Sequence, residues 1–237
     1  MYKELEKLCT VYTKEMIKSG ECIYMDNNSD ILGVAHLDTV FDTSKTANFY
    51  FENDNYVFSP KLDDRAGAFA LLYYIPKHFK NIKYDILLTT DEEIGRSTAG
   101  AFKTEKQYKW IFEFDRQGTG AVMYDYELIY NWSETVSKNF KLYHGSYSDI
   151  CRLDGLNACA LNIGTGYHNQ HTISCYLNKR EFEKQIRRFA NFYSANKNIH
   201  FPYYNDYEFV DDEQEYIDGY FADSFYNDKY CDLENIV

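Results

Sequence analysis

Five short motifs in this chain carry acidic or histidine side chains in fixed order. They are His36-Leu37-Asp38, Asp63-Asp64-Arg65-Ala66-Gly67, Asp91-Glu92-Glu93-Ile94-Gly95, Glu113-Phe114-Asp115 and His168-Asn169-Gln170-His171-Thr172. Carboxylate oxygen and imidazole nitrogen are donor atoms for zinc and similar divalent cations. Most of the motifs follow an apolar run of strand type, and α/β folds place their chemistry at the carboxyl ends of such strands. The five motifs together suggest a hydrolase that uses two zinc ions.

The first two motifs each combine a possible metal ligand with a neighbouring carboxylate. His36 ends a predicted strand, and Asp38 can accept the N–H of its second ring nitrogen, which would fix the tautomer. The alternative for this pair is a core histidine beside a turn aspartate. Asp63 and Asp64 begin a predicted helix, where a carboxylate can cap the helix or bridge two cations. The residues alone leave these alternatives open.

The third and fourth motifs supply carboxylates to the same edge of the predicted sheet. Glu92 and Glu93 follow the apolar run Ile86-Leu87-Leu88-Thr89-Thr90. Adjacent side chains on an extended segment point in different directions, so one can bind metal while the other serves as general acid and base. An exposed acidic turn is the alternative. Asp115 ends the next apolar strand on the same face as Glu113, and a polar strand end facing water is its alternative.

The last motif contains two histidines, His168 and His171, after the glycine-rich segment Gly164-Thr165-Gly166. We expect one of them to bind metal and the other to be structural or to face solvent. The spacing by itself does not choose between them.

Strands that alternate with helices predict an α/β fold, a three-layer helix–sheet–helix sandwich around a mostly parallel mixed sheet. The expected strands are 21–25, 31–36, a hairpin over 48–58, 84–90, 110–114, 121–124 and 158–163. The expected helices are 5–20, 66–74 ending near Pro76, 97–104, 134–142 and 179–196. The last of these is amphipathic, with Phe182, Ile186, Phe189 and Tyr193 on one face.

The composition limits the domain organisation and the partners of the chain. Its 237 residues suit a single catalytic domain over 1–202, followed by an acidic, aromatic-rich tail over 203–237 that we expect to be partly packed. A net charge of -12 argues against nucleic acid and anionic membranes. No apolar run is long enough to span a membrane. Six scattered cysteines and a charged N-terminus without a signal peptide predict a cytoplasmic protein.

With these motifs, the chain resembles the co-catalytic zinc aminopeptidases and carboxypeptidases and the related N-acyl amino acid deacylases. The resemblance runs from about Gly33 to Thr172 and is carried by Ala-His-Leu-Asp-Thr, Leu-Asp-Asp-Arg-Ala-Gly and Thr-Asp-Glu-Glu-Ile-Gly. It implies two Zn²⁺ per chain, with Co²⁺ or Mn²⁺ as possible substitutes. It assigns the roles as follows: His36 and Asp115 hold one zinc, Glu93 and His171 hold the other, Asp63 bridges both, Glu92 is the general acid and base, and Asp38 orients His36.

The resemblance also implies a substrate class. We expect an aminopeptidase of small peptides that attacks through a metal-bridging hydroxide; the alternatives are a deacylase of N-acyl amino acids, a carboxypeptidase, or a non-catalytic binding protein that retains the fold. The second domain that many relatives insert is absent, so oligomerisation is possible but unspecified. Tyr147 and Tyr167 are candidates for stabilising the oxyanion, and Asp149 for binding a substrate amine or capping a helix.

Overall fold

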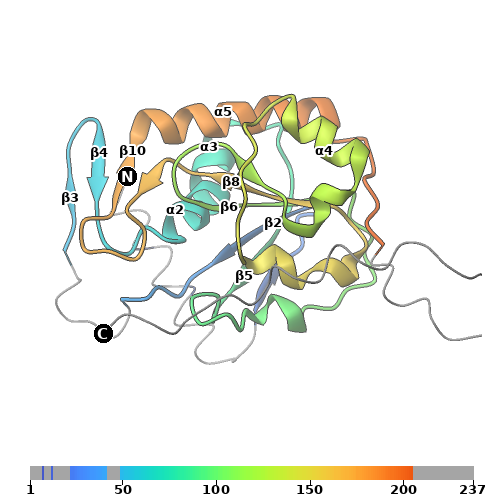
Figure 1. The fold of residues 1–237 in the computed structure, drawn as a ribbon, viewed down its shortest axis with the longest axis horizontal. Helices are drawn as coiled ribbons and strands as arrows, with labels where there is room; N and C mark the ends of the chain where they lie inside the picture. Colours follow the sequence, from blue (N-terminus) through green and yellow to red (C-terminus); the bar gives the residue numbers. More distant parts are fainter. Residues whose placement is uncertain (1–6, 8–11, 13–21, 42–48, 205–237) are drawn as a thin grey trace, which may run out of the picture. The chain divides into compact units, whose positions relative to one another are not determined.

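The computed structural model describes residues 7, 12, 22–41 and 49–204, all within one compact unit, Met1–Asn205. Its centre is a six-stranded sheet (Figure 1). The strands, in spatial order, are β1 (Ile23–Met25), β5 (Asp85–Thr89), β2 (Ile31–His36), β6 (Trp110–Arg116), β8 (Ala160–Gly164) and β7 (Ala121–Val122). The four central strands are parallel, and β1 and β7 pair antiparallel at the two edges. This confirms the mostly parallel mixed sheet.

Helices cover both faces of this sheet, as the sandwich prediction requires. On one face lie α5 (Lys179–Asn196) and a continuous helix formed by α2 (Arg65–Phe69), the π-helix η2 (Ala70–Tyr74) and α3 (Ile75–His78). The short 3-10 helices η3 (Thr98–Ala101), η4 (Tyr124–Leu128) and η5 (Asp149–Arg152) contact the strands too. Another 3-10 turn, η6 (Asp154–Leu156), follows η5. The fold class is confirmed, although one helical layer consists of short 3-10 turns.

The predicted end of a helix near Pro76 is wrong, because the helix continues to His78. A proline inside a regular α-helix clashes with the carbonyl group four residues earlier. Here the widened π turn of η2 directly precedes the segment that contains Pro76. The wider turn relieves that clash, so the chain continues as a helix.

The helix predicted over 134–142 is also displaced, since α4 spans Tyr130–Ser137. Its buried side chains, Trp132 and Val136, are four residues apart and face the core. Leu142 instead forms a bridge with Ala121 beside β7. The bounds of α5 and its buried face are confirmed. The helix predicted over 5–20 and most of the predicted tail lie outside the described residues.

A second, antiparallel sheet has four strands in the order β3 (Phe51–Glu52), β4 (Tyr56–Phe58), β10 (Tyr176–Asn178) and β9 (Tyr167–His168). The hairpin of β3 and β4 was predicted, but β9 and β10 were not. Strands of two or three residues are too short to show a period-two pattern. The turn between β9 and β10 carries His171, so this sheet positions one of the candidate ligands.

The core is unusually aromatic where β6 meets α5. The ring of Phe112 lies 4.3 Å from that of Phe189, and Trp110 packs edge-on against Phe192. Tilted and edge-to-face pairs of this kind stabilise a core beyond simple burial of their area. Among the described residues, no helix combines the length and apolar character needed to cross a membrane.

Candidate metal centre

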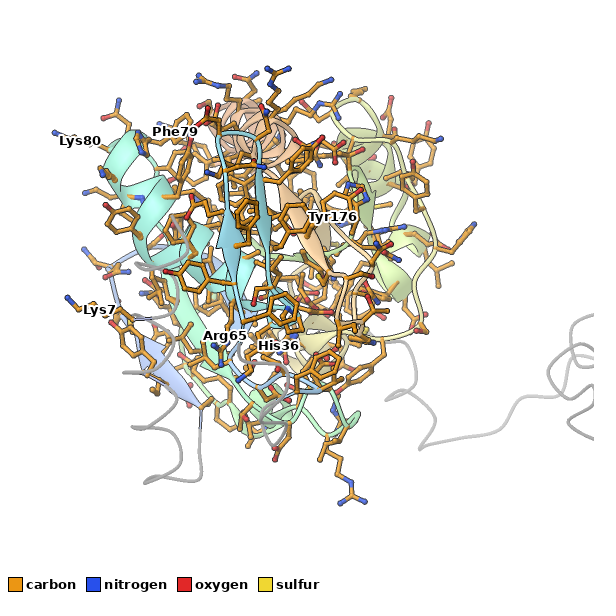
Figure 2. The ribbon with its side chains drawn as sticks, turned by 90° about the vertical axis from the view of Figure 1, so that its left-hand side faces the viewer. Lys7, His36, Arg65, Phe79, Lys80 and Tyr176 are labelled. Atoms are coloured by element: carbon orange, nitrogen blue, oxygen red, sulfur yellow. The ribbon has the colours of Figure 1, made fainter. Side chains whose placement is uncertain are left out.

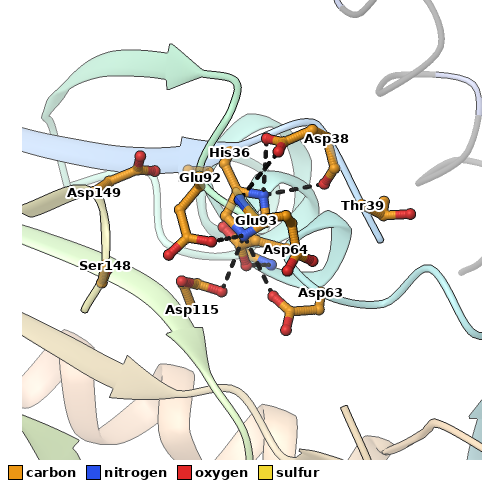
Figure 3. A network of polar contacts seen from close by, with 12 residues as sticks. His36, Asp38, Thr39, Asp63, Asp64, Glu92, Glu93, Asp115, Ser148 and Asp149 are labelled. Carbon is orange, nitrogen blue, oxygen red and sulfur yellow. Dashed lines mark hydrogen bonds and ion pairs between the residues drawn. The ribbon is translucent and has the colours of Figure 1, made fainter. Parts of the chain in front are cut away.

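The predicted site residues come together at the carboxyl ends of the parallel strands (Figure 3). His36 is the last residue of β2, Asp115 lies near the end of β6, and Glu92 and Glu93 follow β5. Parallel pairing of β2 with β5 and β6 brings these three ends to one edge of the sheet. The start of α2 adds Asp63, so the strand order itself assembles the site.

Three carboxylates surround one nitrogen of His36, which is fully buried. Its Nε2 lies 3.3 Å from Asp63 Oδ1, 3.4 Å from Asp115 Oδ1 and 3.7 Å from Glu92 Oε2. Two overlapping sets of ligand atoms lie within 4.8 Å of one another: His36 with Glu92 and Asp115, and His36 with Asp63 and Glu93. This spacing matches that of donors around a shared cation.

The Asp63 carboxylate lies between two imidazoles. Its Oδ1 faces His36, while its Oδ2 is 3.1 Å from Nε2 of His171. The same nitrogen of His171 lies 2.9 Å from Glu93 Oε2. Each carboxylate oxygen of Asp63 thus faces a different histidine. A ligand that bridges two cations needs this arrangement.

Asp38 holds the other side of the His36 ring. Nδ1 of His36 is 3.3 Å from Asp38 Oδ1 and 3.1 Å from the Asp38 carbonyl oxygen. The second carboxylate oxygen of Asp38 accepts a hydrogen bond from the backbone N–H of Glu93, at 3.2 Å. A proton on Nδ1 would leave Nε2 free to bind metal, and Asp38 also fixes the segment that carries Glu93.

His168 and Asp64 are the sequence alternatives to the ligands His171 and Asp63, and they lie in different surroundings. His168 pairs with Glu181 at 2.7 Å and stacks on Tyr176. Asp64 accepts a hydrogen bond from the backbone N–H of Gly67 at 3.0 Å and caps α2. The structure therefore brings His171 and Asp63 to the cluster and gives His168 and Asp64 other partners.

The three residues proposed to contact substrate have different exposures. Tyr147 is half-buried and lines the cleft. Tyr167 is fully buried, and its hydroxyl donates to Asp115 Oδ1 at 3.4 Å. Asp149 is also fully buried and accepts hydrogen bonds from Thr89 at 2.7 Å and from Ser97. Each of its two carboxylate oxygens accepts one of these hydrogen bonds, and no side chain caps the start of η5.

Several supporting residues were missed from the sequence. Asn162 accepts a hydrogen bond from the backbone N–H of Asp115 and donates to its carbonyl, both at 3.1 Å. Ser148 donates to the buried carboxylate of Glu113. Ser97 connects the loop after Glu93 to Asp149. A polar Asn162 inside the apolar strand Ala160–Gly164 was the available signal.

Electrostatics also distinguish this cluster from an ordinary buried polar network. Burial first, and then neighbouring carboxylates, raise the pKa of Glu92 and that of Glu93 to about 7. Burial and Asp63 likewise raise the pKa of Asp115 well above its usual range. Although burial opposes it, Asp115 raises the pKa of His36 well above its ordinary value. The cluster thus holds more carboxylates than two imidazoles can neutralise.

Two orphaned atoms show that the cluster fits a cation. Nε2 of His36 and Oε1 of Glu93 are buried and make no hydrogen bond within the described part of the chain. Buried polar atoms without partners are costly, and a divalent cation satisfies both donor types at once. The residues present therefore fit a metal centre of the zinc type.

A cleft of about 250 Å³ opens over the cluster. It is lined by Asp63, Glu92, Glu93, Gly95, Asp115, Ser146, Tyr147, Gln170 and His171. None of these lining residues is lysine or arginine. The cleft is therefore suited to a substrate end that carries no negative charge.

No protein-family model and no curated protein matches this sequence. Solved structures do share its fold. An aminopeptidase PepT from Bacillus cereus superposes with a TM-score of 0.56 at 14% identity, covering 80% of this chain and 91% of its own. A tripeptidase from Staphylococcus aureus gives 0.53 at 11% identity, with coverages of 72% and 82%. The dodecamer PhTET1-12s gives 0.51 at 14%, with 71% and 84%.

Proposed function

We propose that this chain is a dinuclear zinc hydrolase that removes amino-terminal residues from small peptides. The observation that carries the proposal is the Asp63 carboxylate, placed between His36 and His171 with one oxygen toward each. Two of the structures with this fold are those of an aminopeptidase and a tripeptidase, which supports the same class of reaction.

Five residues would hold the metal ions. His36 and Asp115 would bind one zinc, Glu93 and His171 the other, and Asp63 both. Co²⁺ or Mn²⁺ can substitute because the donors are imidazole and carboxylate. When bound, the two ions would activate a water molecule as a nucleophile and polarise the scissile carbonyl group.

Glu92 is the proton carrier in this proposal. Its Oε2 lies 3.7 Å from Nε2 of His36, so it borders the ligand cluster. Burial raises the pKa of its carboxyl to about 7, and a group of that pKa can take up and release a proton near neutrality. Glu92 would accept the proton of the attacking water and deliver it to the leaving amine, while Asp38 keeps the His36 ring in place.

The cleft favours an aminopeptidase over a carboxypeptidase or deacylase. Those alternatives need a cation for a substrate carboxylate. The arginines within or close after the segments that carry candidate site residues are Arg65, Arg96, Arg116 and Arg152. None of them lines the cleft. Arg116 instead lies over the Tyr143 ring, and Arg152 packs against Gly100. Among the described residues, the free thiols of Cys151, Cys159 and Cys175 support a reducing, cytoplasmic location for the enzyme.

Hydrolysis of aminoacyl amides with and without a chelator tests this function. We expect release of the free amino acid, its loss with chelator and its recovery with added zinc. N-acyl amino acids and carboxy-terminally free peptides with a blocked amino end serve as the comparison. Cleavage of those substrates instead of the amides would establish the deacylase or carboxypeptidase reaction and contradict the proposal.

A further inference from the structure

The outer face of the second sheet carries a straight row of four aromatic rings. Phe51 pairs with Phe58, Phe58 with Tyr176, and Tyr176 with His168, each directly across neighbouring strands. Their ring centroids are 5.9, 5.8 and 5.1 Å apart in that order. We name these four residues the aromatic row; Figure 2 views the molecule from this side, with Tyr176 labelled.

This face is apolar where an antiparallel sheet is usually polar. The inward side chains, Val57, Leu177 and Tyr167, are buried and already supply the core contacts. Phe51 on the outward side is 58% exposed, and Phe58, Tyr176 and His168 are half-buried. Sheets with one buried face normally place polar residues on the other. A row of partly exposed rings therefore indicates a surface that contacts an apolar ligand.

Two members of the aromatic row lie a few residues along the chain from ligands of the candidate metal centre. His168 at its end is three residues before His171, and Phe58 is five residues before Asp63. Chain connectivity limits these separations to about 10 Å and about 17 Å between Cα atoms. An extended peptide advances about 3.3 Å per residue, so a peptide held at the cleft would need about three to five residues to reach the row.

The polar side chains beside the aromatic row favour an apolar ligand on it. His168 and Glu181 form a hydrogen bond at 2.7 Å, and Lys179 pairs with Glu52 at 2.6 Å. These polar side chains therefore have partners within the domain. The other three members of the row are Phe51, Phe58 and Tyr176. They offer a ligand only aromatic ring surface and one phenol group.

We propose that the aromatic row binds apolar side chains of the peptide substrate downstream of the bond that is cleaved. The preferred substrates are then peptides of about four or more residues with an aromatic or aliphatic side chain at the fourth or fifth position. This inference rests on the proposed function, because it places the substrate's amino end at the metal centre. It adds a subsite that the cleft itself does not contain.

A substrate series tests the subsite with the full-length, zinc-loaded protein. The probes are an aminoacyl amide and two pentapeptides that differ only in Leu or Ser at the fourth and fifth positions. We expect wild-type kcat/KM to be about tenfold higher for the Leu peptide, mainly through a lower KM, because one aromatic–apolar contact of this kind contributes that much. Equal values for the two pentapeptides would overturn the proposal without any variant.

Tyr176→Ala and Phe58→Ala should each remove most of that preference. Tyr130→Ala is the matched control, because Tyr130 is 76% exposed on α4, away from the second sheet. We expect the ratio of Leu to Ser peptide kcat/KM to fall about tenfold in the row variants and to stay constant in the control. An unchanged ratio in folded row variants would contradict the subsite.

Two further outcomes separate this proposal from others. If the wild-type protein cleaves none of the probes, including the aminoacyl amide, the result contradicts the proposed aminopeptidase function itself as well as the subsite. If sedimentation shows a dimer that Tyr176→Ala dissociates while the peptide preference is absent, the row contacts a second copy of the chain, which overturns the proposal.

Discussion

Strand β5 begins with a buried carboxylate, Asp85. Beyond its other end lies the glutamate pair of the candidate metal centre, Glu92 and Glu93. At the amino end, Asp85 is fully buried. Its carboxylate accepts hydrogen bonds from the hydroxyls of Tyr24 and Tyr108, the ammonium group of Lys106 and the backbone N–H groups of Asn27 and Ser29. Beyond the carboxyl end, Glu93 has one buried oxygen without a hydrogen bond in the described part of the chain.

The two ends therefore differ in what neutralises the charge. Burial opposes it, but the hydrogen bonds of Lys106 and Tyr24 lower the pKa of Asp85. Burial and neighbouring carboxylates raise the pKa of Glu92 and Glu93 to about 7. A carboxylate surrounded by donors stabilises the fold, whereas carboxylates grouped without donors need a cation from outside. Burial alone does not distinguish a structural acid from a functional one.

The largest effect should come from Glu92→Ala. Because Glu92 carries a proton and is not assigned as a ligand, the variant should bind zinc normally and lose a factor on the order of 10²–10⁴ in kcat. Metal analysis and aminoacyl-amide kinetics on the same sample measure both quantities. Wild-type activity in the variant would show that Glu92 does not carry the proton. The carboxylates at the two ends of β5 would then no longer differ in function.

Substituting the two histidines of the last motif should separate a ligand from a structural partner. His171→Ala should lose one of two zinc ions, since Nε2 of His171 contacts both Asp63 and Glu93. His168→Ala is the matched control, since its imidazole pairs with Glu181, and should retain both ions. Zinc titration followed by mass spectrometry distinguishes the variants; the reverse pattern would transfer the ligand role to His168.

Asp85→Ala should affect stability and not chemistry. It leaves several buried donors without an acceptor, which costs about 2–3 kcal/mol of unfolding free energy. Urea denaturation measures this loss, and zinc content per folded chain should stay at the wild-type value. Loss of metal together with stability would show that the two ends of β5 are not independent.

The sequence predicts the metal-site end of β5 but not the hydrogen-bonded carboxylate at its other end. The motifs predict the strand ends and the cluster around His36, because apolar runs followed by acidic residues define the edge of a parallel sheet. The hydrogen bonds around Asp85 could not be predicted from the sequence. Their donors come from positions 24, 27 and 29, in β1 and the turn after it, and from positions 106 and 108 before β6, and they meet only in the folded sheet. Local spacing does not encode contacts of that range.

The same limit explains the errors around the site. The polar segment Ser146-Tyr147-Ser148-Asp149 predicted a substrate contact at Asp149, but it gave no sign of the hydrogen bonds that Thr89 and Ser97 donate to this carboxylate. The two-residue strand β9 and the three-residue strand β10 were missed because such short strands leave no pattern, and with them the aromatic row. The helix 65–78 was shortened in the prediction because the π turn before Pro76 has no sequence signature.

The smallest effect concerns pH. In metal-free protein, Glu92 and Glu93 have a folded pKa of about 7, above the unfolded value of 4.5, so the folded state binds more protons between these values. Stability should therefore rise as pH falls from about 7 toward 4.5, by at most about 1.4 kcal/mol per pH unit for each of the two groups. Asp85 acts in the opposite sense, since its lowered pKa makes its contribution disappear as pH falls below 3.8.

Thermal unfolding of the metal-free protein across pH measures this effect. Glu92→Gln with Glu93→Gln should reduce the rise between pH 7 and 4.5, while the raised pKa values of Asp115 and His36 leave part of it in place. A stability that instead falls steadily from pH 7 to 4.5 would contradict the assignment of raised pKa values to this end of β5.

Zinc stoichiometry tests the central claim most directly. Metal-free protein is titrated with zinc, and bound metal per chain is counted by mass spectrometry for the wild type and for Asp63→Ala. Because Asp63 faces both histidines, we expect about two zinc ions in the wild type and a weakened affinity for both in the variant. A wild-type chain that binds no zinc, or an Asp63→Ala chain that binds two as tightly as the wild type, would contradict the bridging role and the dinuclear site.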